Sequence, residues 1–278
     1  MSEEKWFKRG VALGKLGKDE EAIKAFDKVI EMNPQNYGAW SNKGVSLDKL
    51  GRYEEAIKAY DKAIETNPQD YKAWSNKGAC LDKLGKHKEA IKAYDKAIEI
   101  NPQFADAWFN KGYALGMLGK HKEALEAYDK AIETNPQDYG AWSNKGACLD
   151  KLRRYEEAIK AYNKAIEISP QNAEVWYNKG YILGRLGRYK DAIGAFDKAI
   201  EINPQYAEAC YNKGVALALL KRYEDAIGAF DKAIEINPQY AEAWFNKGVA
   251  LDRLKRYKEA LEAYNKAYKI NPFVRQLV

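Results

Sequence analysis

The residues best suited to chemistry are seven asparagines that recur at one constant spacing along the chain. They are Asn42, Asn76, Asn110, Asn144, Asn178, Asn212 and Asn246. An asparagine amide carries both hydrogen-bond donors and an acceptor. A row of such amides could hold the backbone of an extended polypeptide without reading its side chains. The other interpretation is that duplication of near-identical repeats copied a harmless asparagine.

Large aromatic residues cluster one residue before or three residues after some of these asparagines. They are Phe109, Tyr113, Tyr177, Tyr181, Tyr211 and Phe245. Exposed aromatic side chains are typical anchors of protein interfaces. These six are therefore candidate partner-binding residues. The alternative is that they pack against neighbouring parts of the same chain.

The sequence contains no recognisable catalytic or metal-binding motif. It has no phosphate-binding loop, no H-E-x-x-H, no C-x-x-C and no G-x-S-x-G. His87 and His121 are separated by the same spacing as the asparagines and are expected to pack or face solvent rather than share a metal. Cys80, Cys148 and Cys210 are expected to be reduced and buried. We therefore expect no enzymatic activity and no cofactor.

The sequence pattern recurs along the chain of 278 residues with a strict period, which equals the separation of Asn42 from Asn76. The period predicts a solenoid of eight stacked units rather than a single closed core. The repeats span residues 3–36, 37–70, 71–104, 105–138, 139–172, 173–206, 207–240 and 241–274, with a short tail at 275–278. Position numbers below count from the first residue of each repeat, so the asparagines occupy position six.

Each repeat encodes two helices. In the fifth repeat, apolar or small residues from Ala141 to Leu152 follow a helical spacing, and so do those from Ala158 to Ile166. Arg153 and Arg154 lie between the two runs. Pro170 follows the second run and cannot continue a helix. Each unit is therefore predicted to be a helix–turn–helix hairpin.

Glycine fills position eight of every repeat, in the middle of the first predicted helix. Glycine costs about 1 kcal/mol there relative to alanine. We expect that it permits close approach of the second helix, with the alanine at position twenty, such as Ala158, facing it. A second set, Gly17, Gly51, Gly85, Gly119 and Gly187, is expected to cap the first helices.

The repeated pattern resembles the tetratricopeptide repeat, whose unit has the same length. It has tryptophan at position four, glycine at eight, alanine at twenty and twenty-seven, tyrosine or phenylalanine at twenty-four and proline at thirty-two. The resemblance covers residues 3–274. It implies an all-α, right-handed superhelix whose first helices line a concave groove. Position six would line that groove, where the asparagines resemble the ladder that holds polypeptides in O-linked N-acetylglucosamine transferase.

Two departures from the family pattern are informative. Position seven is usually leucine but is basic here, from Arg9 and Lys43 to Lys247, and we expect it to add positive charge beside the groove. Position four carries Cys210 in the seventh repeat, which predicts a packing defect. The family's clamp for chaperone C-termini is not expected, because position five is never basic and position nine is never asparagine.

These observations predict a non-enzymatic scaffold that binds a polypeptide or protein partner. A nucleic-acid-binding solenoid is the alternative, supported by the net charge of +6, although 40 acidic residues balance 46 basic ones. A third possibility is self-association. Asp–Lys neighbours at positions twelve and thirteen, such as Asp48 and Lys49, are expected to form a solvated face.

The ends of the chain differ in polarity. Glu3, Glu4 and Lys5 give the first repeat a polar start, whereas Tyr268 and Lys269 polarise the last helix only slightly. The apolar flank of the eighth repeat is therefore expected to remain partly open, and either to contact another chain or to be covered by a ninth element that this sequence does not include. The start of the sequence has no apolar secretory core and no segment resembles a membrane span, so we expect a cytoplasmic protein.

Overall fold

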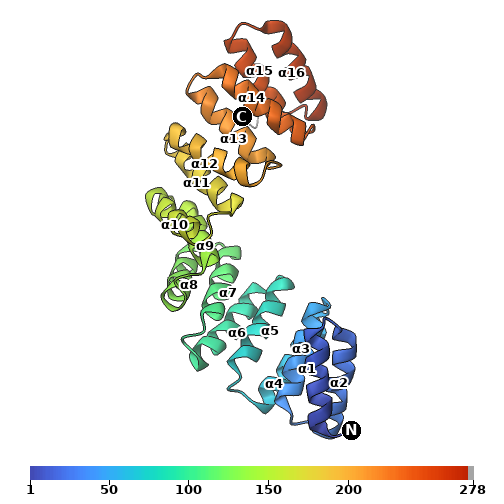
Figure 1. The fold of residues 1–278 in the computed structure, drawn as a ribbon. Helices are drawn as coiled ribbons and strands as arrows, with labels where there is room; N and C mark the ends of the chain where they lie inside the picture. The colour runs from blue at the N-terminus through green and yellow to red at the C-terminus, as the bar shows by residue number, and fades with distance from the viewer. Residues whose placement is uncertain (275–278) are drawn as a thin grey trace. The chain divides into compact units, whose positions relative to one another are not determined.

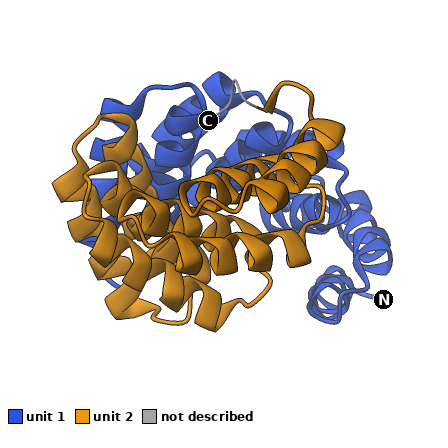
Figure 2. Ribbon diagram, turned by 90° about the horizontal axis from the view of Figure 1, so that it is seen from above, with its two compact units in different colours: residues 1–137 blue, residues 138–278 orange. Residues whose placement is uncertain are grey.

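The computed structural model describes residues 1–274, which form sixteen α-helices and no strand (Figure 1). The chain divides into two compact units, residues 1–137 and residues 138–278 (Figure 2). Four hairpins build each unit. The predicted fold class, an all-α solenoid of helix–turn–helix repeats, is confirmed.

The first unit contains eight helices. They are α1 (Glu3–Lys15), α2 (Asp19–Met32), α3 (Tyr37–Lys49), α4 (Tyr53–Thr66), α5 (Tyr71–Lys83), α6 (His87–Ile100), α7 (Ala105–Met117) and α8 (His121–Thr134). Each first helix packs against the second helix of its own repeat, and α2, α4 and α6 each pack against the first helix of the next repeat. First helices of successive repeats also contact each other. The face formed by first helices, called the inner face below, is therefore the more tightly curved side of the unit.

The second unit repeats this arrangement. Its helices are α9 (Tyr139–Lys151), α10 (Tyr155–Ile168), α11 (Ala173–Arg185), α12 (Tyr189–Ile202), α13 (Ala207–Leu219), α14 (Tyr223–Ile236), α15 (Ala241–Arg253) and α16 (Tyr257–Ile270). First helices again contact each other, as α11 does α13 and α13 does α15. All sixteen helices lie inside the predicted hairpins.

The core of each repeat is built on the contact between the glycine at position eight and the aromatic ring at position twenty-four. A Cβ atom on Gly78 would lie 2.6 Å from the Tyr94 ring, and one on Gly146 would lie 2.8 Å from the Tyr162 ring. The prediction that glycine allows the second helix to approach closely is confirmed. The predicted contact residue was wrong, because the glycine makes room for this ring and not for the alanine at position twenty.

The loops use local hydrogen bonds. The Trp74 indole nitrogen donates to the Pro68 carbonyl at 3.1 Å, and Trp40, Trp108, Trp176 and Trp244 make the same bond to the proline six residues earlier. The predicted capping glycines all have left-handed backbone, with φ between 72° and 75°. Arg153, Lys221 and Lys255 adopt that conformation in the other repeats, where a side chain makes it strained.

Candidate functional site

The predicted asparagine row lies on the first helices, and all seven side chains are half-buried. Four of them use their amides inside the protein. Asn42 donates to the Gly38 carbonyl at 2.7 Å, Asn212 to the Tyr177 hydroxyl at 3.1 Å and Asn246 to the Tyr211 hydroxyl at 2.9 Å. Asn76 hydrogen-bonds the Tyr60 hydroxyl. These four amides therefore have a structural role that the sequence did not suggest.

The other three asparagines of the row are Asn110, Asn144 and Asn178. Within residues 1–274 the side chains of these three make no hydrogen bond to another residue. Their donors and acceptors are available to a ligand. They are the strongest candidates of the predicted row for contact with a polypeptide backbone.

The aromatic candidates also divide into two groups. Tyr177 packs on Phe196 and Tyr206, with ring centroids 5.9 and 4.9 Å away. Tyr211 packs in the same way on Phe230 and Tyr240. Burial raises the pKa of both tyrosines. These rings are half-buried parts of the repeat contacts.

Phe109 and Phe245 belong to the same half-buried group, because each packs on the aromatic ring at position twenty-four of its own repeat. The ring centroids of Phe109 and Tyr128 are 5.9 Å apart, and those of Phe245 and Tyr264 are 5.3 Å apart. Tyr113 and Tyr181 differ, because they are 47% and 43% exposed. Of the six predicted anchors, these two present the most ring surface to a partner.

Five of the lysines at position seven are held in ion pairs, so the expectation of free positive charge beside the groove was wrong for these five. Lys77 lies over the Trp74 ring, 5.5 Å from its centroid, and pairs with Asp61 of the preceding repeat. Lys43, Lys111 and Lys247 make the same two contacts. Lys213, which has no tryptophan beneath it, keeps only the ion pair with Asp197. These cations connect successive repeats and are neutralised.

Positions twelve and thirteen pair between repeats rather than within one. Lys83 lies 2.6 Å from Asp48 of the preceding repeat, and Arg185 lies 2.8 Å from Asp150. Each cation also covers a tyrosine ring, Tyr53 or Tyr155. The two cations remain solvated, since their side chains are 45% and 39% exposed, but the sequence analysis did not predict that they pair with the preceding repeat. The clue in the sequence is the constant separation of base and acid, one repeat plus one residue.

The histidines and cysteines have packing roles. His87 Nδ1 lies 2.9 Å from Asp82, and burial raises the pKa of that carboxyl although His87 and Tyr94 hydrogen-bond it. All three cysteines are buried, and burial raises the pKa of Cys80 to about 12 and of Cys148 to about 11. No cluster of three potential metal ligands occurs within residues 1–274. No helix of this part is long and apolar enough to cross a membrane.

Comparison with known families matches nearly all of the solenoid. Models described as tetratricopeptide repeat match residues 7–71, 109–173 and 177–241, and another matches residues 71–104 and 241–273. The chain belongs to the tetratricopeptide repeat family. A search of curated proteins found no match.

Solved tetratricopeptide repeat structures resemble this chain. YrrB, described as a TPR protein with an unusual peptide-binding site, is 28% identical, covers 72% of this chain and 99% of its own length, with a TM-score of 0.61. A MamA structure is 26% identical over 62% of this chain and 94% of its own, with a TM-score of 0.56. The C-terminal part of a repeat protein from Cytophaga hutchinsonii is 18% identical, and the match covers 86% of this chain and 98% of its own, with a TM-score of 0.73. At this identity the likeness shows the fold alone.

Proposed function

We propose that this protein is a non-enzymatic scaffold that binds an extended polypeptide along the inner face of its repeats. The observation that carries the proposal is the set of unused amides at Asn110, Asn144 and Asn178. Two of them have an exposed tyrosine three residues later on the same helix, Tyr113 on α7 and Tyr181 on α11. Residues three apart share one face of a helix. An amide that holds the backbone and a ring that contacts a side chain form one peptide-binding unit.

The comparisons support this function in general terms. YrrB is described as having a peptide-binding site and shares the repeat architecture over nearly its whole length. The basic residues at position seven give little support to nucleic-acid binding, because Lys43, Lys77 and Lys111 are paired with aspartates. A steep fall of affinity with salt would nevertheless favour a nucleic-acid ligand, since phosphate contacts release counterions.

Replacing Asn110, Asn144 and Asn178 together with alanine tests the proposal. A fluorescein-labelled, C-terminally amidated peptide of four Gly-Ala-Thr units serves as the probe, because backbone recognition needs no particular side chains. We expect anisotropy to show at least a tenfold loss of affinity, from three lost hydrogen bonds of about 1 kcal/mol each. The melting temperature should stay the same or rise, because alanine is the better helix former.

The matched control replaces three exposed cations on second helices, Lys88, Lys122 and Lys190, with alanine. This control should bind the probe like the unchanged protein. Equal affinity of the asparagine variant and the control would contradict the proposal. A large drop in the melting temperature of the asparagine variant would show instead that the three amides are structural.

Self-association is a second candidate, favoured by the surface of α16. Tyr257 and Leu261 are 63% and 60% exposed one helical turn apart, and Phe273 is 68% exposed. Val274 folds against Ala241 and Ala267 and does not cover these residues. We expect light scattering to show a mass that rises toward a dimer with concentration, and Leu261→Glu to abolish the rise. A monomer at every concentration would contradict self-association through this surface.

A further inference from the structure

The seventh repeat lacks the indole that every other repeat carries at position four, and Cys210 stands in its place. In the other repeats the indole N–H donates to the carbonyl of the proline six residues earlier, as Trp176 does to Pro170 at 2.9 Å. Pro204 lies six residues before Cys210, and within residues 1–274 its carbonyl accepts no hydrogen bond. A hydrogen-bond acceptor that the other repeats use is therefore unused in the seventh.

The cation that lies over the indole in other repeats is also retained. Lys213 is at position seven, and its ammonium lies 2.6 Å from the carboxylate of Asp197. Lys77 and Lys247 make the same ion pair and lie over an indole ring, and their side chains are each 22% exposed. The side chain of Lys213 is 30% exposed, because no ring lies beneath it. The seventh repeat thus keeps a cation in place for a ring face that the chain does not supply.

The place of the missing indole is part of a hollow of about 490 Å³ between α12, α13 and α14. Its apolar walls come from Ile193 and Ile200 of the sixth repeat and from Leu217 of the seventh. The tryptophan at position four is only half-buried in every repeat that has one, so this place can be reached from solvent. The hollow is therefore a surface site with the walls of an indole pocket.

A second departure from the repeat pattern widens the hollow. Gly228 lines it at position twenty-two, in the middle of α14, where the third and fifth repeats carry Lys92 and Lys160 beside the corresponding hollows. A Cβ atom on Gly228 would meet no atom within 4 Å. Packing inside the chain therefore does not require glycine here, although glycine is unfavourable within a helix. The absence of a side chain leaves the hollow more open than its counterparts.

The charged groups that line the hollow offer little to a charged ligand. Each of its three cations lies close to a carboxylate, at 2.6, 2.7 and 2.9 Å in the pairs Lys213–Asp197, Arg222–Asp225 and Lys232–Glu235. Glu224 adds one more carboxylate to the lining, which disfavours an anion. A neutral aromatic group with one hydrogen-bond donor matches this environment better than an ion does.

We propose that this hollow binds the tryptophan side chain of a partner polypeptide. The partner's indole would donate its N–H to the Pro204 carbonyl, place its face beneath Lys213 and bury its apolar edge against Ile200. Phenylalanine has no donor, and an indole is the best aromatic partner for a cation. The chain's own tryptophans define the occupant, since they lie in the same surroundings in the other repeats.

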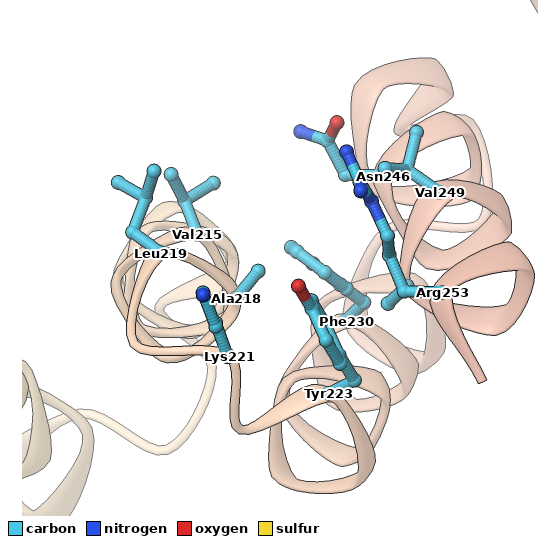
Figure 3. A pocket seen from close by; sticks show the side chains of 10 residues that line it. Val215, Ala218, Leu219, Lys221, Tyr223, Phe230, Asn246, Val249 and Arg253 are labelled. Atoms are coloured by element: carbon cyan, nitrogen blue, oxygen red, sulfur yellow. The ribbon is translucent and has the colours of Figure 1, made fainter.

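This site is separate from the inner face. A hollow of about 420 Å³ lies between α13, α14 and α15, and Val215 and Leu219 of α13 line it (Figure 3). Asn246 of the asparagine row also lines this inner hollow, which shares no lining residue with the hollow beside Cys210. The indole site therefore goes beyond the proposed function. It would allow the protein to hold a second partner while a polypeptide occupies the inner face.

Two capped tripeptides test the proposal, acetyl-Ser-Trp-Ser-amide and acetyl-Ser-Leu-Ser-amide. Their backbones are identical, so any contact with the inner face contributes equally to both. We expect isothermal titration calorimetry to show at least tenfold tighter binding of the tryptophan peptide, because leucine has neither an N–H group nor a ring face. Cys210→Trp fills the hollow from within the chain and should remove this preference.

Lys213→Met is a second variant, which removes the cation but keeps an unbranched side chain. It should weaken binding of the tryptophan peptide about threefold, the loss expected for one cation–π contact. Lys179→Met is the matched control, because Lys179 is the same residue type at position seven of the sixth repeat, where Trp176 already lies beneath it. This control should keep the full preference for tryptophan.

Equal binding of the two tripeptides by the unchanged protein would overturn the inference. So would a preference that Cys210→Trp retains, or equal effects of Lys213→Met and Lys179→Met. Tighter binding of free indole than of the tryptophan peptide would assign the hollow to a small molecule and overturn the polypeptide partner. The amidated Gly-Ala-Thr peptide has no aromatic side chain and should bind Cys210→Trp normally, so this test and that of the asparagines fail separately.

Discussion

Gly78→Ala is expected to lower the free energy of unfolding by about 3 kcal/mol, the cost of forcing extra volume into a packed core. The added Cβ would lie 2.6 Å from Tyr94 Cε1. Tyr94 cannot retreat easily, because it is 1% exposed and its hydroxyl is held by Asp82 at 2.9 Å. Denaturant titration followed by circular dichroism measures the change.

Gly116→Ala is the matched control, because Gly116 also lies in a first helix but no atom lies within 4 Å of its added Cβ. Here alanine should stabilise the protein by about 0.5 to 1 kcal/mol through helix propensity alone. Opposite signs for the two variants would establish that the ring, and not helix flexibility, requires glycine at position eight. A neutral Gly78→Ala would contradict this explanation.

The periodicity made the fold predictable. The tryptophans, the position-eight glycines and the prolines each recur in a single phase, so the helix predictions of the eight repeats reinforce one another, and the hairpins lie where the spacing places them. Local signals also sufficed for the capping glycines, whose left-handed backbone depends on their own residue type. A feature that depends on residues of a single repeat can be inferred from the sequence of that repeat.

Contacts between repeats were harder to predict. Lys43 pairs with Asp27 of the preceding repeat, and Lys83 pairs with Asp48. The sequence gives both residue types but not the geometry that brings them together. For the same reason the sequence suggested a free lysine row, and it did not indicate that Asn212 and Asn246 donate to tyrosine hydroxyls of the preceding repeat.

The pairs at position thirteen also depend on the preceding repeat. Lys83 and Arg185 pair with Asp48 and Asp150. Lys151 and Arg253 follow repeats that carry Gly116 and Ala218 at position twelve, so the same pair cannot form there. The residue at position thirteen therefore does not by itself show whether its charge is paired.

Cys210→Trp is expected to raise the free energy of unfolding by about 2 kcal/mol, through one new hydrogen bond and newly buried apolar surface. A hollow of about 490 Å³ beside Cys210 is lined by Ile193 and Ile200 of the preceding repeat. The corresponding hollow in the third repeat contains Trp74 and is lined by that repeat alone. The indole normally closes the hollow toward the preceding repeat, and cysteine leaves it open.

The new indole would regain interactions that the other repeats possess. Its N–H can donate to the Pro204 carbonyl, as Trp176 donates to Pro170 at 2.9 Å. Its face can lie beneath Lys213, which the ion pair with Asp197 already holds in place at 2.6 Å. A hydrogen bond contributes about 1 kcal/mol, and burial of roughly 50 Å² of apolar surface adds about another.

Cys210→Leu separates these contributions, because leucine fills apolar space without an N–H group or a ring face. Thermal and denaturant unfolding of both variants should place tryptophan above leucine and leucine near the unchanged protein. A tryptophan variant that is less stable than the unchanged protein would show that Ile200 and its neighbours have closed over Cys210, which is 2% exposed. The seventh repeat would then have repacked around its cysteine instead of retaining space for the missing indole.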